Sequence, residues 1–168
     1  MTLDELKAHA RRVPDELLTQ GDLAVADAVF APDVVQHGPI PHVRGVAGAK
    51  QSVMALRRAF PDLCAVIEDE IAEGDTVVQR LTLSGTHRGG CCGLPPTGRR
   101  ATWAVVAIHR LGPDGKVAEH WSSPDLFGLL QQLGAVPNSG TPPHRGTRDP
   151  TPGTHRHVEE HRATISDA

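Results

Sequence analysis

The hydrophobic and polar positions change their spacing about a third of the way along the chain. Apolar residues in the first 60 positions recur at helical spacing, most clearly over residues 46–60. Thr2 and Glu5 form a capping-box pattern that predicts a helix start beside the N-terminus, and Pro14 predicts a kink or the first turn of a renewed helix. Two short amphipathic helices are expected before Phe30. The first third is therefore predicted to be mainly helical.

From Leu63 onward the apolar positions follow the shorter period of strands. A short strand, VVQH, precedes this region, and four long ones follow: CAVIEDEIAE, TVVQRLTLSGT, ATWAVVAIHRL and VAEHWSSPD. A Gly-Asp turn joins the first two long strands, and GPDGK joins the last two. A final short helix, LFGLLQQL, is stopped by Gly134. This order predicts an α+β fold, with about three helices packed on one face of a curved antiparallel sheet.

The composition changes after the last expected helix. Residues 137–168 are rich in Pro, Gly, Thr, His and charge and contain few apolar residues. Such a segment cannot bury enough surface to offset the entropy of ordering, so it is predicted to be a disordered tail behind a folded domain of residues 1–136. Its histidines could chelate a metal, although a solvated tail is the simpler interpretation.

Charge and cysteine content exclude several classes of protein. A net charge of -3 leaves no basic stripe for nucleic acid, and no apolar run is long enough to span a membrane. The N-terminal segment has no apolar stretch of the kind found in signal peptides. Three cysteines, two of them adjacent, do not form a disulfide framework. A cytoplasmic protein is expected.

The third long strand carries a candidate catalytic histidine. Alternation places Trp103, Ala107 and His109 on one face of ATWAVVAIHRL. An imidazole on the interior side of a sheet can donate to a substrate carbonyl or assist proton transfer. The alternative is an ordinary, partly buried histidine at a strand end.

The fourth strand ends on an acid, which strands rarely do. Alternation places Trp121, Ser123 and Asp125 on one face and turns His120 to the other, while Pro124 breaks the ladder before the acid. An acid on the same face as a tryptophan is either a surface charge or the working group of a pocket. Asp125 is also well placed to N-cap the LFGLLQQL helix.

Four segments taken together resemble the SnoaL-like polyketide cyclases, or ester cyclases, of the nuclear-transport-factor-2-like superfamily. They are QGDLAVADAVFAPDVVQH, RRAFPDL, SGTHRG…GLPPTGRRATW and DGKVAEHWSSPDLFGLLQQLG, and they span about residues 17–134. The resemblance implies a cone-shaped sheet around a deep apolar pocket, and homodimers or higher oligomers. It also implies cofactor-free and metal-free closure of a polyketide ring by an intramolecular aldol reaction on a methyl ester.

The resemblance also implies roles for individual residues. Asp125 matches the family's acid/base aspartate, and an apolar cone would raise the pKa of its carboxyl towards the operating pH. The strand pattern, and not the resemblance, makes His109 the second expected catalytic residue, and Glu119 is expected to be an outward or salt-bridged acid. The residues expected to bind a hydrophobic, polyketide-like substrate are His37, Trp103, Ala107, Trp121 and Ser123.

Other functions remain open on the same fold, because fold alone does not choose the chemistry. The cone could host hydroxylation, isomerisation, dehydration or epoxide opening. It could instead be a non-catalytic module that binds an apolar ligand or dimerises. A metal site built from His37, His42, His87 and His109 has no recognisable ligand spacing to support it.

Overall fold

The computed structural model describes residues 1–39 and 43–137 of the chain. These residues form four α-helices, one π-helical segment and six strands. The helical elements are α1 (Leu3–Arg12), η1 (Val13–Gln20), α2 (Val25–Val29), α3 (Gly45–Ala59) and α4 (Leu126–Leu133). The strands are β1 (Phe30–His37), β2 (Val43–Arg44), β3 (Cys64–Glu73), β4 (Thr76–Thr86), β5 (Arg100–Leu111) and β6 (Val117–Pro124).

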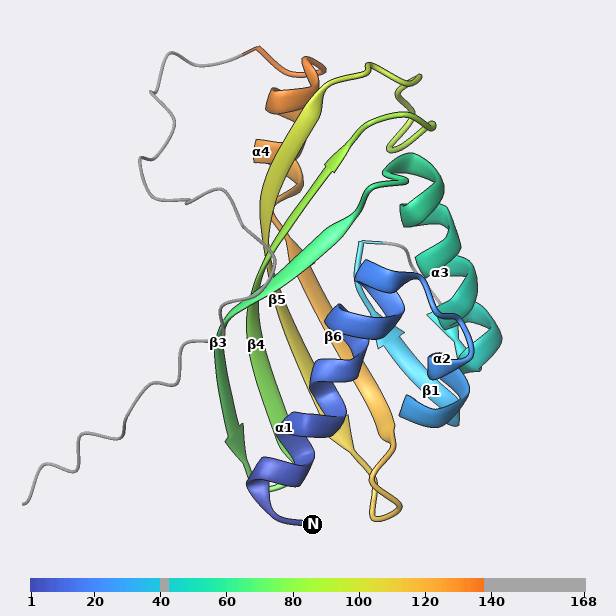
Figure 1. The fold of residues 1–168 in the computed structure, drawn as a ribbon, viewed down its shortest axis with the longest axis vertical. Coiled ribbons are helices and arrows are strands. Elements are labelled where there is room, and N and C mark those ends of the chain that lie inside the picture. The colour runs from blue at the N-terminus through green and yellow to red at the C-terminus, as the bar shows by residue number, and fades with distance from the viewer. Residues whose placement is uncertain (40–42, 138–168) are drawn as a thin grey trace, which may run out of the picture.

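The strands form one strongly bent sheet in the order β2-β1-β6-β5-β4-β3 (Figure 1). All neighbouring strands are antiparallel except β1 and β6, which run parallel, so the sheet is mixed. Figure 1 shows α1 crossing in front of the sheet, α3 beside β1, and α4 at the far end of β5. The face covered by α1, η1, α2 and α3 is called the inner face below, and the opposite one the outer face.

The first helical elements form as the capping pattern predicts. The Thr2 hydroxyl accepts a hydrogen bond from the Glu5 N–H, and the Glu5 carboxylate accepts one from the Thr2 N–H, which completes the capping box. Pro14 lies in the first turn of η1, which follows α1 directly, and the Val13 N–H donates to the Ala10 carbonyl at this junction. The prediction of a renewed helix at this proline is confirmed.

Gly21 ends η1 and fixes how α3 packs against it. Its φ of 76° lies in the left-handed region, and a Cβ there would come within 2.6 Å of Arg57 Nε. The Arg57 guanidinium occupies that space and donates to the carbonyls of Leu18 and Thr19, at 2.6 and 2.9 Å. An arginine of α3 therefore satisfies the carbonyls that the end of η1 leaves free.

The core consists of two groups of buried apolar side chains on the two halves of the sheet. The first lies under the N-terminal helices and includes Leu17, Val29 and Val117. The second surrounds Phe60 and Trp103, whose ring centroids are 4.9 Å apart. Together they join the helices to the sheet along its length.

A bulge in the β5–β6 hairpin decides which side chains of β6 face inward. Leu111 pairs with Val117, but the next residue of β5, Arg110, pairs with Glu119. Ala118 is therefore an extra residue on β6. Because side chains alternate along a strand, one extra residue turns all later residues of β6 to the other face.

The expected α+β cone with helices on one face is confirmed, although the sheet is not purely antiparallel. The parallel β1–β6 pair brings the N-terminal third against the end of the folded chain, and local pattern gives no sign of it. The two-residue strand β2 was also not expected. The predicted disordered tail lies almost entirely outside the described residues. No helix within the described residues is long and apolar enough to cross a membrane.

Candidate active site

A cluster of polar side chains lies inside the apolar inner face. Gln79 and His109 are both completely buried. Register explains why they meet: His109 pairs with Val77 on β4 and with His120 on β6, and Gln79 is two residues further along β4. All four side chains therefore point to the inner face. The prediction that His109 shares this face with Trp103 and Ala107 is confirmed by their common burial.

Hydrogen bonds join this cluster into one chain that runs from α1 to β6. Arg11 Nε donates to Glu70 Oε2 at 2.9 Å, and Gln79 Nε2 donates to Glu70 Oε1 at 2.7 Å. Gln79 Oε1 lies 3.2 Å from His109 Nε2, and His109 Nδ1 lies 3.3 Å from His120 Nδ1. Burial of so many polar groups is tolerated because each has a partner.

Burial keeps His109 and His120, the two histidines of the hydrogen-bond chain, uncharged at neutral pH. Desolvation is the main cause that lowers the pKa of His109 well below 6.5, and the charges of His120 and His9 lower it further. Desolvation, followed by the charge of His37, lowers the pKa of His120 to about 4. Neutral imidazole offers one donor and one acceptor, so the direction of each hydrogen bond matters here.

Two of the expected substrate-binding residues lie deeper along the same face. Trp103 is 4 % exposed and packs on Phe60. Phe60 in turn packs on the buried ring of His87, with the two ring centroids 5.4 Å apart. Ala107 lies between Trp103 and His109 along β5 and is 3 % exposed. The inner face is thus aromatic at one end and imidazole-lined at the other.

The structure places two other residues expected to bind the substrate, Trp121 and Ser123, on the outer face. Trp121 pairs with Ile108, and Ser123 pairs with Val106, both of which face outward. The expectation that Trp121, Ser123 and His109 line one interior is therefore corrected, and the cause is the one-residue bulge at Ala118. The prediction that His120 lies on the opposite face from Trp121 is confirmed.

A second cluster surrounds Trp121 on the outer face. His37 stacks on the indole, with ring centroids 5.1 Å apart, and the Arg110 guanidinium lies 5.7 Å from its ring centre. Glu119 accepts a hydrogen bond from His37 Nε2 at 2.7 Å and forms an ion pair with Arg110. Glu119 is therefore the salt-bridged acid that the sequence predicts, and His37 is held away from the inner face.

Asp125 lies at the junction of β6 and α4 and is exposed. Its Oδ1 accepts a hydrogen bond from the Gly128 N–H at 2.9 Å, so the side chain is the N-cap of α4. The capping role predicted as the alternative to catalysis is confirmed. Asp125 is not brought into contact with His109, which lies on the inner face.

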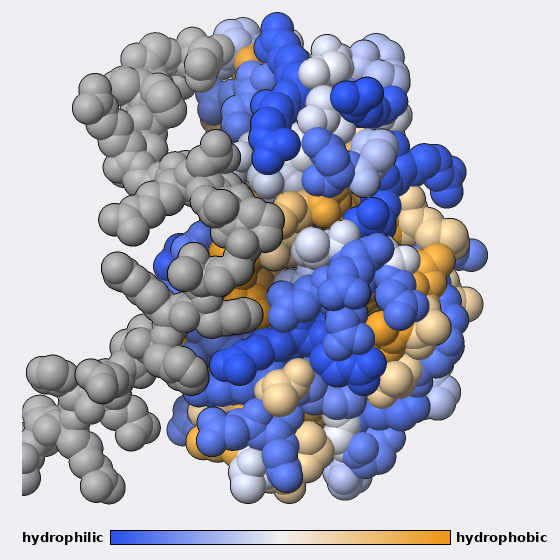
Figure 2. All heavy atoms as spheres, viewed as in Figure 1, coloured by the Kyte–Doolittle hydropathy of each residue, from blue (hydrophilic) through white to orange (hydrophobic). Residues whose placement is uncertain are grey.

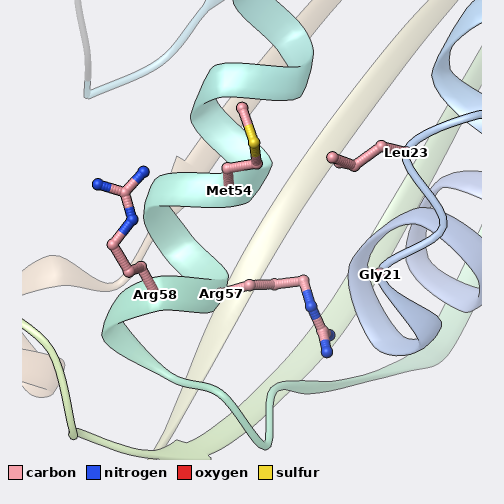
Figure 3. Close-up of a pocket in the computed structure, with 5 residues that line it drawn as sticks. All are labelled: Gly21, Leu23, Met54, Arg57 and Arg58. Carbon is pink, nitrogen blue, oxygen red and sulfur yellow. The ribbon is translucent and has the colours of Figure 1, made fainter.

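Two hollows in the described part of the chain lie at its surface. One, of about 300 Å³, is bordered by Gly21, Leu23, Met54, Arg57 and Arg58. Figure 3 shows Arg57 pointing from α3 towards Gly21, whereas Arg58 points away from that turn. The other, of about 440 Å³, lies beside Thr86, His87, Arg88, Pro96 and Gly98. Figure 2 shows that the helix-covered side is mainly hydrophilic, with small apolar patches between polar side chains.

The histidines considered as metal ligands are not brought together. His37 is on the outer face, His87 packs on Phe60, His109 is on the inner face, and His42 lies outside the described residues. In residues 1–39 and 43–137, no three His, Cys, Asp or Glu side chains form a group that could hold a metal ion.

Residues 8–133 match the model of a protein family described as SnoaL-like polyketide cyclase. The chain belongs to this family. The match covers the helices, the sheet and α4, so the resemblance of the four sequence segments is confirmed.

Similar SnoaL-like proteins are known by both sequence and structure. Aklanonic acid methyl ester cyclase DnrD of Streptomyces peucetius is 35% identical over 104 residues, which are 61% of this chain and 70% of the relative. Nogalonic acid methyl ester cyclase of Streptomyces nogalater is 34% identical over 111 residues, 64% of this chain and 82% of the relative. The crystal structure of AclR from Streptomyces galilaeus, a proposed hydroxylase, is 31% identical with a TM-score of 0.72, over 82% of this chain and 85% of AclR.

Sequence reasoning missed Gln79, Glu70 and the inward side of His120. Glu70 and Gln79 belong to different strands and pair only when β3 and β4 are in register, beyond an irregularity between Ile67 and Asp69. The available signal was a glutamine and a glutamate in strands that otherwise carry apolar inner positions.

Proposed function

We propose that this SnoaL-like protein is a polyketide cyclase, which closes a carbocyclic ring by an intramolecular aldol reaction on a polyketide methyl ester. The observation that carries the proposal is the similarity to two methyl ester cyclases across the folded domain. The buried histidine chain on the inner face supports it, because such perturbed polar groups inside an apolar interior are common at functional sites.

The reaction needs one proton removed and one returned. A base takes a proton from the carbon between two carbonyls, and the resulting enolate carbon attacks a ketone of the same molecule. A new carbon–carbon bond forms, the ketone becomes an alkoxide, and the alkoxide takes a proton to become a hydroxyl. Substrate and product are isomers, so the proposed chemistry consumes no redox cofactor.

Asp125 is the proposed acid/base residue in this scheme, by its match to the family position. Its carboxylate would accept the proton from carbon and its acid form would return one to the alkoxide. The side chain is exposed where β6 meets α4, so it can exchange protons with substrate and water. The inner face, with His109, Trp103 and Ala107, is proposed to hold the polyketide body.

The test is turnover of a panel of anthraquinone polyketide methyl esters, with products identified by chromatography and mass spectrometry. A ring-closed product at unchanged mass, lost at least about 10²-fold in Asp125→Asn, supports the cyclase. A product heavier by one oxygen would assign hydroxylation instead, the alternative favoured by the similarity to AclR. Binding without any turnover would contradict the assignment as an enzyme and indicate a ligand-binding module instead.

The cellular compartment and the oligomeric state are proposed on separate grounds. We propose that the protein works in the cytoplasm, which suits the free thiols of Cys64, Cys91 and Cys92.

We further propose a homodimer formed through the outer face. Ile71, Val78, Ile108 and Trp121 are in register across four strands there and form an apolar row. Ile71 is 68 % exposed, and charges of both signs flank the row, which suits pairing with a second copy.

A further inference from the structure

The hydrogen-bond chain on the inner face fixes the position of each proton along it. Glu70 receives hydrogen bonds from Arg11 and from Gln79, and its side chain is only 6 % exposed. A carboxylate paired with arginine can only accept, so the Gln79 amide must turn its NH₂ group towards Glu70. The Gln79 carbonyl oxygen then faces His109.

The orientation of Gln79 determines the tautomer of His109. The Gln79 carbonyl can only accept, so the hydrogen on the His109 ring must lie on Nε2 to bridge the 3.2 Å between them. A neutral imidazole carries one ring hydrogen, which leaves His109 Nδ1 as an acceptor. Both ring nitrogens of His109 are thus used inside the protein, and neither is left for a substrate.

The same logic extends one step further, to His120. The two Nδ1 atoms are 3.3 Å apart, and since His109 Nδ1 accepts, His120 Nδ1 must carry the hydrogen and donate it. His120 Nε2 is then left with a lone pair. Unlike His109, His120 is only partly buried, and so are its inner-face neighbours Gln36 and Ser122. The hydrogen-bond chain therefore ends among partly exposed residues of the inner face.

We propose that His120 is a ligand-binding residue whose Nε2 accepts a hydrogen bond from a hydroxyl of the ligand, an enol or a phenol. Arg11, Glu70, Gln79 and His109 are positioning residues that hold its tautomer. This inference rests on the proposed function, since it names the group by which the SnoaL-like cone recognises an aromatic polyketide. A ligand that offers only a carbonyl or an ether oxygen at this point would meet a lone pair and be rejected.

The first test reads the tautomers directly. In ¹⁵N-histidine-labelled protein at pH 7, the ring cross-peaks of His109 should show the Nε2–H form and those of His120 the Nδ1–H form. Glu70→Gln should disturb both, because a glutamine at position 70 can donate as well as accept and allows Gln79 to turn over. Asp69→Asn is the matched control: it removes a neighbouring carboxylate paired with Arg80 and should leave both patterns unchanged. Nε2–H on His120 in the wild type would overturn the proposal.

The second test measures the ligand preference by calorimetry with 2-hydroxyanthraquinone and its methyl ether. The wild type should bind the hydroxyl compound about tenfold more tightly, the usual scale of one hydrogen bond. His120→Asn keeps a donor near the Nδ1 position but loses the Nε2 acceptor, so the preference should vanish. His120→Gln, which places an amide oxygen near the Nε2 position, should retain part of it.

The outcomes separate this inference from the proposed function. Equal affinity of the wild type for the two compounds would overturn the hydroxyl assignment while leaving a polyketide site in place. Binding of neither compound would overturn the aromatic ligand class of the proposed function and the ligand assignment with it. The NMR result would still decide the tautomer of His120.

Discussion

The Asp125 carboxylate and the Gly128 N–H are joined by a 2.9 Å hydrogen bond, so one side chain both follows β6 and begins α4. An N-cap oxygen satisfies an otherwise free donor of the first helical turn. The residue that the family resemblance marks as the acid/base therefore has a structural task as well. Substitutions must be chosen to separate the two tasks.

Asp125→Asn and Asp125→Ala provide that separation. Asparagine caps helices about as well as aspartate, so Asp125→Asn should retain the wild-type free energy of unfolding while turnover falls at least about 10²-fold. Asp125→Ala should lose turnover and also about 1 kcal/mol of stability. Urea denaturation and steady-state kinetics measure the two effects. Wild-type turnover by Asp125→Asn would leave the residue as a helix cap alone.

The buried histidines predict that mild acid destabilises the fold. Because burial lowers the pKa of His120 to about 4, the unfolded chain binds protons first as the pH falls below 6.5. His109, whose pKa is also lowered, acts in the same direction. The free energy of unfolding should therefore have its full value above pH 6.5 and decrease as the pH falls from about 6.5 to 4.

Thermal and urea unfolding at pH 7, 6 and 5 would measure this dependence. The variant His120→Asn, which has no titrating ring, should show a flatter profile than the wild type over that range. Equal stability of the wild type at pH 7 and pH 5 would contradict the burial of neutral imidazoles.

The aromatic part of the core predicts a large effect of one phenylalanine and a small effect of another. Phe60 is completely buried between His87 and Trp103, so Phe60→Ala should cost about 3–5 kcal/mol of unfolding free energy. Phe127, on α4, is 60 % exposed and Phe127→Ala should change stability by no more than about 0.5 kcal/mol. Chemical denaturation of both variants makes the comparison, and similar losses would contradict this core.

The apolar row on the outer face predicts how the proposed dimer is disrupted. Ile71→Glu places a charge in the row and should convert dimers to monomers, as measured by sedimentation velocity at several protein concentrations. Met54→Glu is the matched control, since Met54 is also exposed but belongs to α3. A wild-type protein that sediments as a monomer, or equal effects of the two variants, would refute the outer-face interface.

Much of the fold could be predicted from local pattern because the signals and the structure agree. The Thr2–Glu5 capping box, the alternation of Trp103, Ala107 and His109, and the helix that begins after Asp125 all depend on neighbours within a few residues. These features need no knowledge of distant contacts, and the structure bears them out.

The inward side of β6 could not be predicted in the same way. Alternation correctly groups Trp121 with Ser123, but only the pairing of β5 with β6 decides which side of the sheet that group faces. The extra residue Ala118 has no distinctive sequence signature. For the same reason the chain from Glu70 to His120, which depends on the register of three strand pairs, was invisible in the sequence.

The bulge at Ala118 also bears on how such a protein can change over time. Loss of that single residue would restore regular pairing while His120 stayed opposite His109, so the inward side of β6 would not change. Exchange of the two sides needs a different event, in which Ala118 is kept and the pairing of β6 with β5 slips by one residue. Lineages that share this scaffold can therefore shorten this surface hairpin by one codon and still keep the same side chains of β6 in the interior.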